Sequence, residues 1–506
     1  MKFKDVLWSY EFFATNLPFA RGRFVLEIPG SGPDAEWFKQ NRDLIDEHGI
    51  PVVFDTDIRP NDGFVPLNTG TAFGLLRRLE PGRQPSFRDI VILPILPNDL
   101  SRVAGIITEV PQATLSHVNL RAVQNAAPNA FVKDAASLES IAPLIGKFVR
   151  YEVTSAAYHL REATRSEVEA FFDDLRPREP QELIRDLEQR ATKNLDDLGF
   201  ADSAAFGVKA ANVAELRKIS SISPVPEGFA IPFSFYDSFM KHNGLYSAAA
   251  QMASDSRFDE DLEFRDAALA GLRKRIRDAA MPTALQEAIG LLQSEFAGGV
   301  PIRCRSSTNN EDLSGFNGAG LYDSFTHHTD EGHLSKSIKQ VFASLWNLRA
   351  YEEREFYRID HSQVAMGVLV HPASKNELAN GVGVSRNIVL ENPPTDIGDF
   401  YYFNTQVGED LVTNPEAASI PEEILVRKVS TGSQVISYLT SSNRLPEGQE
   451  HVLEEPVVNS LVLDLEKTHD HFRKLYHGDK SFAIEIEFKL DSEGSLLLKQ
   501  ARPWVD

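Results

Sequence analysis

The sequence is poor in cysteine, with a single one among 506 residues. This excludes an intrachain disulfide and a cysteine-based zinc site. The sequence also lacks an apolar run of the about 18 residues that a membrane-spanning helix needs. The longest candidate, residues 90–97, is interrupted by Pro94 and Pro97, and Asp5 and Glu11 lie where a secretory signal would be apolar. We therefore expect a cytoplasmic protein that does not enter a membrane.

Basic residues are in deficit, with 52 Lys and Arg against 73 Asp and Glu and a formal net charge of −21. Nucleic acids and anionic membranes attract a basic surface, so neither is expected as a partner. A local basic pocket for a small phosphate compound remains compatible with this charge. The 42% of hydrophobic residues and the length predict a globular protein of two to four domains.

Apolar patterning predicts a multidomain chain of the α/β and α+β classes. Residues 22–54 have a strand–helix–strand pattern, and a second α/β pattern covers 87–153. Residues 156–203 are charged and helix-forming, and Pro177 and Pro180 interrupt them, which predicts a helical linker. The alternative is a helical hairpin on the surface of one domain. The expected segments are 1–86, 87–155, 156–203 and 204–506.

A small-residue loop leads into a predicted helix within residues 111–122, and His117 lies in its first turn. Unpaired backbone N–H groups and the helix dipole make such a place suitable for phosphate. Arg121 is one turn further on the same face and could pair with a phosphoryl oxygen. A neutral imidazole is nucleophilic near pH 7 and suits a covalent phosphate carrier. The plainer interpretation is a helix cap or a surface histidine.

Residues 302–325 combine a strand with a glycine-rich stretch. Arg303 and Arg305 alternate on the strand and can clamp a polyphosphate, whereas Cys304 faces the opposite side and is expected in the core. Glycines would allow backbone N–H groups to approach phosphate oxygens. These are Gly315, Gly318 and Gly320. A long β-turn loop without a ligand is the alternative.

Residues 481–504 read as a β-hairpin with Glu493–Gly494 as a two-residue turn. This register places two cross-strand pairs on one face. The pairs are Glu487 with Gln500 and Glu485 with Arg502. A carboxylate beside an amide oxygen suits Mg²⁺, and a cross-strand ion pair on a solvated face is the alternative.

Lys209 follows a glycine near the start of a predicted helix over residues 206–216, where it could contact phosphate or simply be solvated. Together these four pieces resemble a known family. Residues 206–504 resemble the ATP-grasp module of phosphoenolpyruvate synthase, pyruvate phosphate dikinase and glucan water dikinase, and residues 97–131 resemble their swivelling phosphohistidine domain. The segments that carry the resemblance are RSSTNNEDLSGFNGAGLYDS, SLWNLRAY and LSHVNLRA, and they and the domain order are most similar to glucan water dikinase.

The resemblance implies that the module binds ATP. Lys209 and Arg305 would hold the ATP phosphates. Glu311 and Arg349 would lie nearby, and Arg502 would assist at the phosphates.

The resemblance also implies a metal ion and a carrier. Glu487 and Gln500 would bind Mg²⁺. Gly408 and Glu409 keep the end of the family's Gly-Leu-Gly-Glu segment and are expected at the nucleotide. His117 would take up the β-phosphate of ATP and pass it to an acceptor.

Three segments depart from the family pattern, one of them being TQVGE in place of Gly-Leu-Gly-Glu. His371 and Pro372 stand where the strand before the adenine site usually ends in Gln or Gln-Glu. Ser385 and Arg386 replace an aromatic–threonine pair. Residues 1–86 match no known pattern.

The predicted function is that of a dikinase-like phosphotransferase, which converts ATP and an acceptor to AMP and a phosphorylated product. The resemblance favours a small-molecule or carbohydrate hydroxyl as the acceptor. One alternative is a phosphorelay protein that passes the group from His117 to a separate acceptor subunit. The other is a nucleotide-binding pseudoenzyme, suggested by the departures at residues 371–372 and 385–386.

Overall fold

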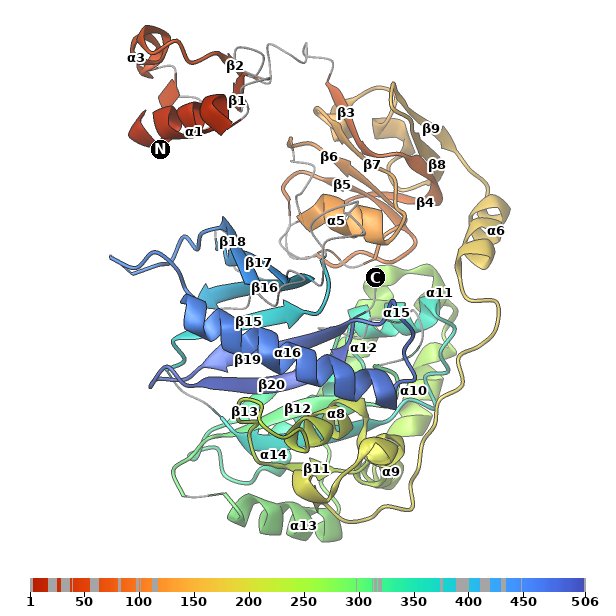
Figure 1. Cartoon of the computed structure of the whole chain (residues 1–506). Coiled ribbons are helices and arrows are strands. Elements are labelled where there is room, and N and C mark those ends of the chain that lie inside the picture. The colour runs from red at the N-terminus through yellow and green to blue at the C-terminus, as the bar shows by residue number, and fades with distance from the viewer. Residues whose placement is uncertain are drawn as a thin grey trace.

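The computed structural model shows a chain built from a small N-terminal unit and two larger parts (Figure 1). The residues described are 3–16, 25–28, 37–38, 40–54, 63–80, 83–96, 100, 102–111, 117–296, 298–311, 313, 316, 321–373, 376–387, 400–409, 419–428, 434–446 and 448–504. The predicted mixed α/β, multidomain organisation is confirmed.

The N-terminal unit is a small layer of helix and sheet. Its two strands pair in parallel, as the strand–helix–strand pattern of residues 22–54 predicts. The elements are α1 (Phe3–Asn16), β1 (Leu26–Ile28), α3 (Arg42–Glu47) and β2 (Val52–Phe54). Their apolar side chains form a core of their own around Phe38 and Ile45, both of which are almost fully buried.

The next part is a seven-stranded sheet in the order β3-β7-β6-β5-β4-β8-β9. Strands β4 to β7 pair in parallel at its centre, and the outer pairs are antiparallel. Every residue of β5 and β6 is buried, as expected for parallel strands covered on both faces. The bounds are β3 (Phe64–Asn68), β4 (Gly70–Arg78), β5 (Asp89–Leu93), β6 (Gly105–Thr108), β7 (Asn129–Val132), β8 (Phe148–Val153) and β9 (Tyr158–Glu162).

The domain boundaries predicted at residues 86 and 155 are wrong, because both cut this sheet. Strands β3 and β4 precede residue 87, yet β4 pairs with both β5 and β8. Strand β9 follows residue 155 and pairs with β8. The boundary was predicted at residue 86 because the long apolar run of β5 begins just after it. Strand β4 gave a weaker signal, because partly buried positions alternate with its buried ones.

The helical linker predicted over residues 156–203 contains one long helix, α6 (Arg165–Leu175), which begins with a Thr164–Glu167 capping box. Beyond Pro177 the chain runs extended along the side of the C-terminal part (Figure 1). Its backbone is held there by contacts to that part, such as Asn309 Nδ2 donating to the Ile184 carbonyl at 3.2 Å. These contacts override the helix propensity of the segment.

The C-terminal part contains two sheets. The first has the order β10-β11-β14-β12-β13, and helices cover one of its faces with a large apolar core. Its strands are β10 (Lys193–Asn194), β11 (Phe229–Ile231), β12 (Ile302–Thr308), β13 (Phe325–His327) and β14 (Met366–Pro372). The accompanying helices are α7 (Ser203–Phe206), α8 (Val208–Arg217), α9 (Phe233–His242), α10 (Leu245–Ala253), α11 (Ser256–Glu260), α12 (Leu262–Asp278), α13 (Thr283–Ser294), α14 (Ser335–Ser344) and α15 (Leu348–Phe356).

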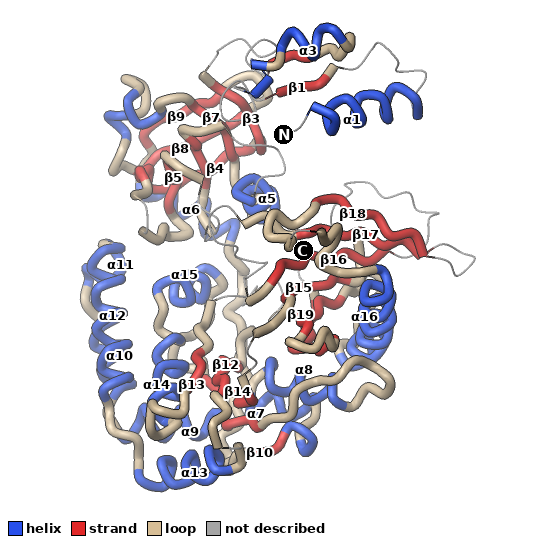
Figure 2. The backbone as a smooth tube through the Cα atoms, turned by 90° about the vertical axis from the view of Figure 1, so that its left-hand side faces the viewer, coloured by secondary structure: helices blue, strands red, loops and turns tan. Residues whose placement is uncertain are grey.

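The second sheet is antiparallel throughout, in the order β18-β17-β16-β15-β19-β20. Helix α16 (Glu455–Leu475) covers one face and forms a separate core with it. Its strands are β15 (Ala379–Val384), β16 (Phe400–Val407), β17 (Glu422–Lys428), β18 (Gln434–Thr440), β19 (Ile484–Leu490) and β20 (Leu496–Pro503). Figure 2 separates the two sheets, with α8 beside them. This is the part of the chain for which the resemblance predicts an ATP-grasp module.

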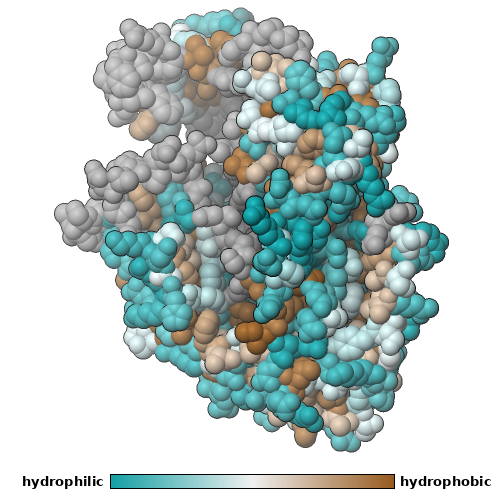
Figure 3. All heavy atoms as spheres, turned by 90° about the vertical axis from the view of Figure 1, so that its right-hand side faces the viewer, coloured by the Kyte–Doolittle hydropathy of each residue, from teal (hydrophilic) through white to brown (hydrophobic). Residues whose placement is uncertain are grey.

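The surface agrees with the composition. The face along which α6 and the extended segment run is largely hydrophilic (Figure 3). None of the described helices combines the length and the apolar composition needed to cross a membrane.

The seven-stranded domain docks on α15 through a mixed contact. Phe87 packs edge-on against Phe356, with ring centroids 5.4 Å apart, and the Arg102 guanidinium lies 4.4 Å from the Phe356 ring centroid. Beside them, the Ser86 hydroxyl donates to Glu352, which is also paired with Arg265. Helix α5 (His117–Gln124) lies on the side of this domain that faces the C-terminal part in both views (Figures 1 and 2).

Asp89 is a buried carboxyl group at this contact, only 2% exposed, and it predicts a pH effect. Burial raises its pKa to about 6, and Arg77 at 3.3 Å offsets this only in part. The unfolded chain, with a pKa of about 3.9, loses the proton first, so stability should fall as the pH rises from 4 to 6. In urea unfolding across that range, Asp89→Asn should remove this loss, whereas Asp174→Asn on the exposed face of α6 should keep it. Parallel profiles for the wild type and Asp89→Asn would contradict the assignment.

Candidate nucleotide-binding site

The start of α8 is fixed by Gly207, whose φ is +87°. A Cβ atom there would lie 2.3 Å from the Ser307 carbonyl oxygen, so only glycine fits. The Ala210 amide donates to Ser307 Oγ at 2.9 Å, which ties the helix to β12. Lys209 is thereby held in the first turn, where its Nζ lies 3.3 Å from Glu311 Oε1.

Strand β12 presents two arginines to one side and its cysteine to the other. Arg303 and Arg305 line a pocket, whereas Cys304 is completely buried, as predicted. Burial raises the pKa of the Cys304 thiol to about 12, so it stays protonated and unreactive.

The C-terminal hairpin has the predicted register in the half that lies away from its turn, with Glu487 opposite Gln500 and Glu485 opposite Arg502. The predicted two-residue turn is wrong, because the strands end at Leu490 and resume at Leu496. A β-bulge reconciles the longer turn with the predicted pairs. Phe488 pairs with Leu498, and Lys499 is the extra residue of the bulge. The bulge leaves the Lys499 carbonyl free to accept from Arg305 Nη1 at 3.2 Å.

Arg305 joins the two sheets. Its Nη2 donates to Glu487 Oε2 at 3.0 Å and to Gln500 Oε1 at 2.7 Å. Burial alone would raise the pKa of Glu487, but Arg305, Lys499 and Lys209 outweigh it and lower the pKa to about 2. The carboxylate therefore remains ionised at any physiological pH.

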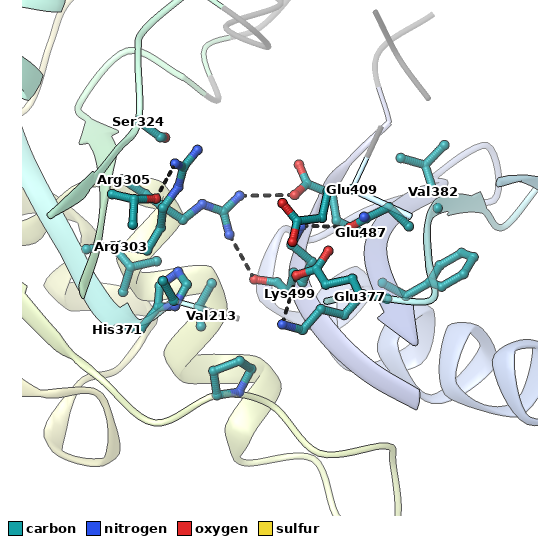
Figure 4. A pocket seen from close by; sticks show the side chains of 18 of the residues that line it. Val213, Arg303, Arg305, Ser324, His371, Glu377, Val382, Glu409, Glu487 and Lys499 are labelled. Carbon is teal, nitrogen blue, oxygen red and sulfur yellow. Dashed lines mark hydrogen bonds and ion pairs between the residues drawn. The ribbon is translucent and has the colours of Figure 1, made fainter. Parts of the chain in front are cut away.

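Around Arg305 the two sheets enclose a cavity of about 350 Å³. Figure 4 shows Arg303, Arg305 and His371 on one wall and Glu377, Glu409, Glu487 and Lys499 on the other. The volume suits a drug-sized ligand or a nucleotide. The apolar part of the pocket lining includes Leu195, Val213, Pro226 and Leu369.

The remaining predicted residues are divided between this pocket and its surroundings. Glu409 lines the pocket next to Gly408, whose φ is +78°, and accepts from the Asn376 amide at 3.2 Å. Arg502 pairs with Glu485 at 2.7 Å, and Arg349 lies in the first turn of α15; neither is part of the pocket lining.

Several predictions fall on residues outside the described part. Helix α5 begins at His117, but the side chains of His117 and Arg121 lie outside the described residues, and so does the loop before them. Gly315, Gly318 and Gly320 are also outside it. Ser385 is described and acts structurally, because its hydroxyl accepts from the Ile484 amide and contacts His469 Nδ1 at 2.8 Å.

The donor set fits Mg²⁺. Glu487 Oε2 and Gln500 Oε1 converge on one nitrogen of Arg305, and both are hard oxygens. Among the described residues, no group of three His, Cys, Asp or Glu side chains could hold a metal ion. A bound Mg²⁺ would therefore also need oxygens from water and from phosphate.

Two pocket lysines were missed by the sequence analysis. Lys489 is two residues from Glu487 on the same strand and pairs with Glu377 at 3.1 Å, so strand alternation carried a signal for it. Lys499 donates to Asn380 Oδ1 at 3.2 Å and reaches the pocket through the bulge. The simple hairpin register gave no signal for Lys499.

Comparison with known proteins agrees with this site. The family model described as "Pyruvate phosphate dikinase, AMP/ATP-binding domain" matches residues 203–505. The chain is 28% identical over 242 residues to the phosphoenolpyruvate synthase of Pseudomonas aeruginosa, covering 46% of this chain and 30% of that protein. It is 22% identical over 368 residues to that of Pyrococcus furiosus, covering 63% and 44%.

A relative of another kind is the rifampicin phosphotransferase of Bacillus cereus, 26% identical over 239 residues, covering 46% of this chain and 26% of that protein. The chain thus spans less than half the length of these curated relatives. The likeness to glucan water dikinase stays a prediction. Because the family model matches more than half of the residues, the chain belongs to the pyruvate phosphate dikinase AMP/ATP-binding domain family.

Proposed function

We propose that this chain is an ATP-dependent phosphotransferase of the dikinase type. It transfers the β-phosphate of ATP through His117 to a hydroxyl-bearing acceptor and releases AMP. The observation that carries the proposal is the cationic pocket around Arg305, which lies within the segment matched by the AMP/ATP-binding family. The synthase and phosphotransferase relatives support the reaction class.

The residues in and beside the pocket would act by positioning charge. Arg305 and Lys209 would hold the triphosphate, and Glu487 and Gln500 would hold Mg²⁺ against it. Bound there, Mg²⁺ would offset the negative charge of the phosphates. The depressed pKa of Glu487 keeps its carboxylate available without a proton to remove first.

The transfer would run in two halves. A ring nitrogen of His117 attacks the β-phosphorus, an N–P bond forms, and the bond to the α,β-bridging oxygen breaks, so that AMP leaves with that oxygen. The γ-phosphoryl group passes to water as phosphate, or to phosphate as pyrophosphate. An acceptor hydroxyl oxygen then attacks the phosphohistidine, the N–P bond breaks, and the histidine is restored.

This scheme requires the histidine domain, the seven-stranded domain that carries His117, to move. His117 must reach ATP in the first half of the transfer and the acceptor in the second. The contact on α15 that would have to part combines apolar and polar groups and includes Phe87, Arg102 and Ser86. The extended chain after Pro177 has no helix that would resist such a movement.

The first prediction of this scheme concerns the carrier. With ATP labelled in the β-phosphate, His117→Asn should abolish acid-labile labelling of the protein while ATP binding persists. His159→Asn, an exposed histidine on β9 of the same domain, should label normally. Normal labelling of His117→Asn would overturn the carrier assignment. Discharge of the wild-type label by a small hydroxyl compound supports the acceptor class, whereas discharge only by another protein would favour the relay.

The metal ligands give a second prediction. Glu487→Gln and Gln500→Ala should each raise the Mg²⁺ concentration for half-maximal AMP formation on the order of tenfold or more, since each removes an oxygen ligand. Glu493→Gln, in the exposed turn of the same hairpin, is the matched control and should leave it unchanged. Wild-type Mg²⁺ dependence in both ligand variants would mean that this pair is only structural.

Domain movement gives a third. Arg83 and Glu263 are exposed partners, 3.9 Å apart, on the histidine domain and α12. Arg83→Cys with Glu263→Cys allows a reducible cross-link, and the native cysteine is buried. The linked protein should be unable to complete both halves of the transfer, and reduction should restore full turnover. Full turnover at the normal rate in the linked protein would show that no movement is needed.

A further inference from the structure

Helix α15 and the residue that follows it contact two parts of the molecule at once. The helix lies at the end of the C-terminal part nearest to the histidine domain in both views (Figures 1 and 2). The histidine domain contacts it through Arg102. The stretch that follows β12 contacts it through Phe316 and Tyr322. That stretch also carries Glu311, which pairs with Lys209 beside the pocket. Helix α15 therefore stands between the docked domain and a residue pair at the nucleotide site.

Tyr357, directly after α15, makes the first of two connections. Arg102 Nη2 of the histidine domain donates to its hydroxyl at 3.1 Å. Its ring packs edge-on against the ring of Phe316, with centroids 5.3 Å apart and planes at 78°. Both rings are buried, and Phe316 is only 1% exposed. One side chain thus holds the docked domain by its hydroxyl and the stretch after β12 by its ring.

Arg354 makes the second connection, and its side chain is almost completely buried. Its Nη1 donates to the Tyr322 hydroxyl at 3.3 Å, and Asn310 Nδ2 donates to the same hydroxyl at 2.8 Å. Arg354 Nε donates to His361 Nδ1 at 3.1 Å. Burial lowers the pKa of His361, so its neutral ring can accept. Asn310 immediately precedes Glu311, and α15 therefore holds the backbone that presents this carboxylate.

Glu311 in turn sets the position of the Lys209 ammonium. Lys209 Nζ lies 3.3 Å from Glu311 Oε1 and 3.5 Å from Ser306 Oγ. A cation that is already held in place loses less conformational freedom when an anionic ligand binds to it. Loss of the Tyr357 contact would release Phe316 and, earlier in the same stretch, Glu311. The readiness of Lys209 for a phosphate therefore depends on contacts made at α15.

We propose that α15 couples docking of the histidine domain to nucleotide binding, with Tyr357 and Phe316 as positioning residues. When Arg102 is docked, Tyr357 is fixed against Phe316, Glu311 stays at Lys209, and a triphosphate binds more tightly. Coupling between two binding events is reciprocal, so the triphosphate favours docking by the same factor. The inference rests on the proposed binding of ATP beside Lys209.

This coupling gives the two halves of the transfer an order. ATP strengthens the docking that brings the carrier domain to the C-terminal part. AMP lacks the phosphates that Lys209 would hold, so the gain in docking ends once the β-phosphoryl group has left the nucleotide. The domain is then released toward the acceptor.

The first experiment measures dissociation constants of ATP for the full chain without divalent cations, so that no phosphate is transferred. Arg102→Met should weaken ATP binding on the order of tenfold, and Phe316→Leu by a similar factor. The double variant should be no weaker than Phe316→Leu alone, because the connection is already broken there. Arg161→Met, an exposed arginine on the edge strand β9 of the same domain, is the matched control and should bind ATP like the wild type.

Unchanged ATP affinity in Arg102→Met, or losses that multiply in the double variant, would overturn the inference. Failure of the wild type to bind ATP would instead overturn the proposed function.

The second experiment measures the reverse direction with Ser86→Cys. Ser86 is 6% exposed and donates to Glu352 at the docking contact, so a thiol reagent reaches a cysteine there only when the domain leaves α15. The native Cys304 is buried. Saturating ATP should slow the modification on the order of tenfold, and AMP should not. Added to Ser86→Cys, Phe316→Leu should remove the effect of ATP, whereas a purely structural role of Phe316 would leave it intact. Equal rates with and without ATP, or equal slowing by AMP, would overturn the inference.

Discussion

The geometry of the site depends on one guanidinium that crosses between two sheets. Arg305 extends from β12 to a carboxylate on β19, and to an amide and a carbonyl oxygen on β20. No strand pairing joins the two sheets in the described residues, and Arg305 is a side chain that connects the two walls directly. The bulge at Lys499 belongs to the same arrangement, because it turns a ladder carbonyl toward the arginine. Glu487 and Gln500 thus occupy the N–H donors of Arg305 that a triphosphate would use. A bound triphosphate would replace the oxygens of these two side chains with phosphate oxygens at the Arg305 guanidinium.

The pocket concentrates positive charge in a chain that is acidic overall. The chain has a net charge of −21, yet the pocket gathers Arg303, Arg305, Lys489 and Lys499 at its walls. Carboxylates pair with two of these cations, Arg305 with Glu487 and Lys489 with Glu377, which limits the cost of burying them. An anionic ligand therefore meets a cationic recess in an acidic surface, and the composition alone was compatible with such a pocket.

The sequence predicted best where a local rule fixes side-chain direction. Strand alternation separated Cys304 from its neighbouring arginines, and hairpin pairing placed Glu487 beside Gln500. Prediction from the sequence failed where contacts between residues far apart in the chain determine the structure. The partners of β4 are β5 and β8, which a local pattern does not reveal, so the boundary at residue 86 cut a sheet. Residues 176–192 have helical composition but lie extended, because backbone and side-chain contacts to the C-terminal part replace helical hydrogen bonds. The bulge has no composition signal, and it hid the role of Lys499.

The central claim is that a nucleoside triphosphate lies between the two sheets with its phosphates on Arg305. The most direct measurement is a crystal structure of the full chain with Mg²⁺ and the non-hydrolysable β,γ-imido analogue of ATP. The account predicts that the triphosphate displaces Glu487 and Gln500 from Arg305 and that both side chains contact Mg²⁺. A nucleotide bound elsewhere, or a pocket in which Arg305 keeps all its present partners, would contradict it.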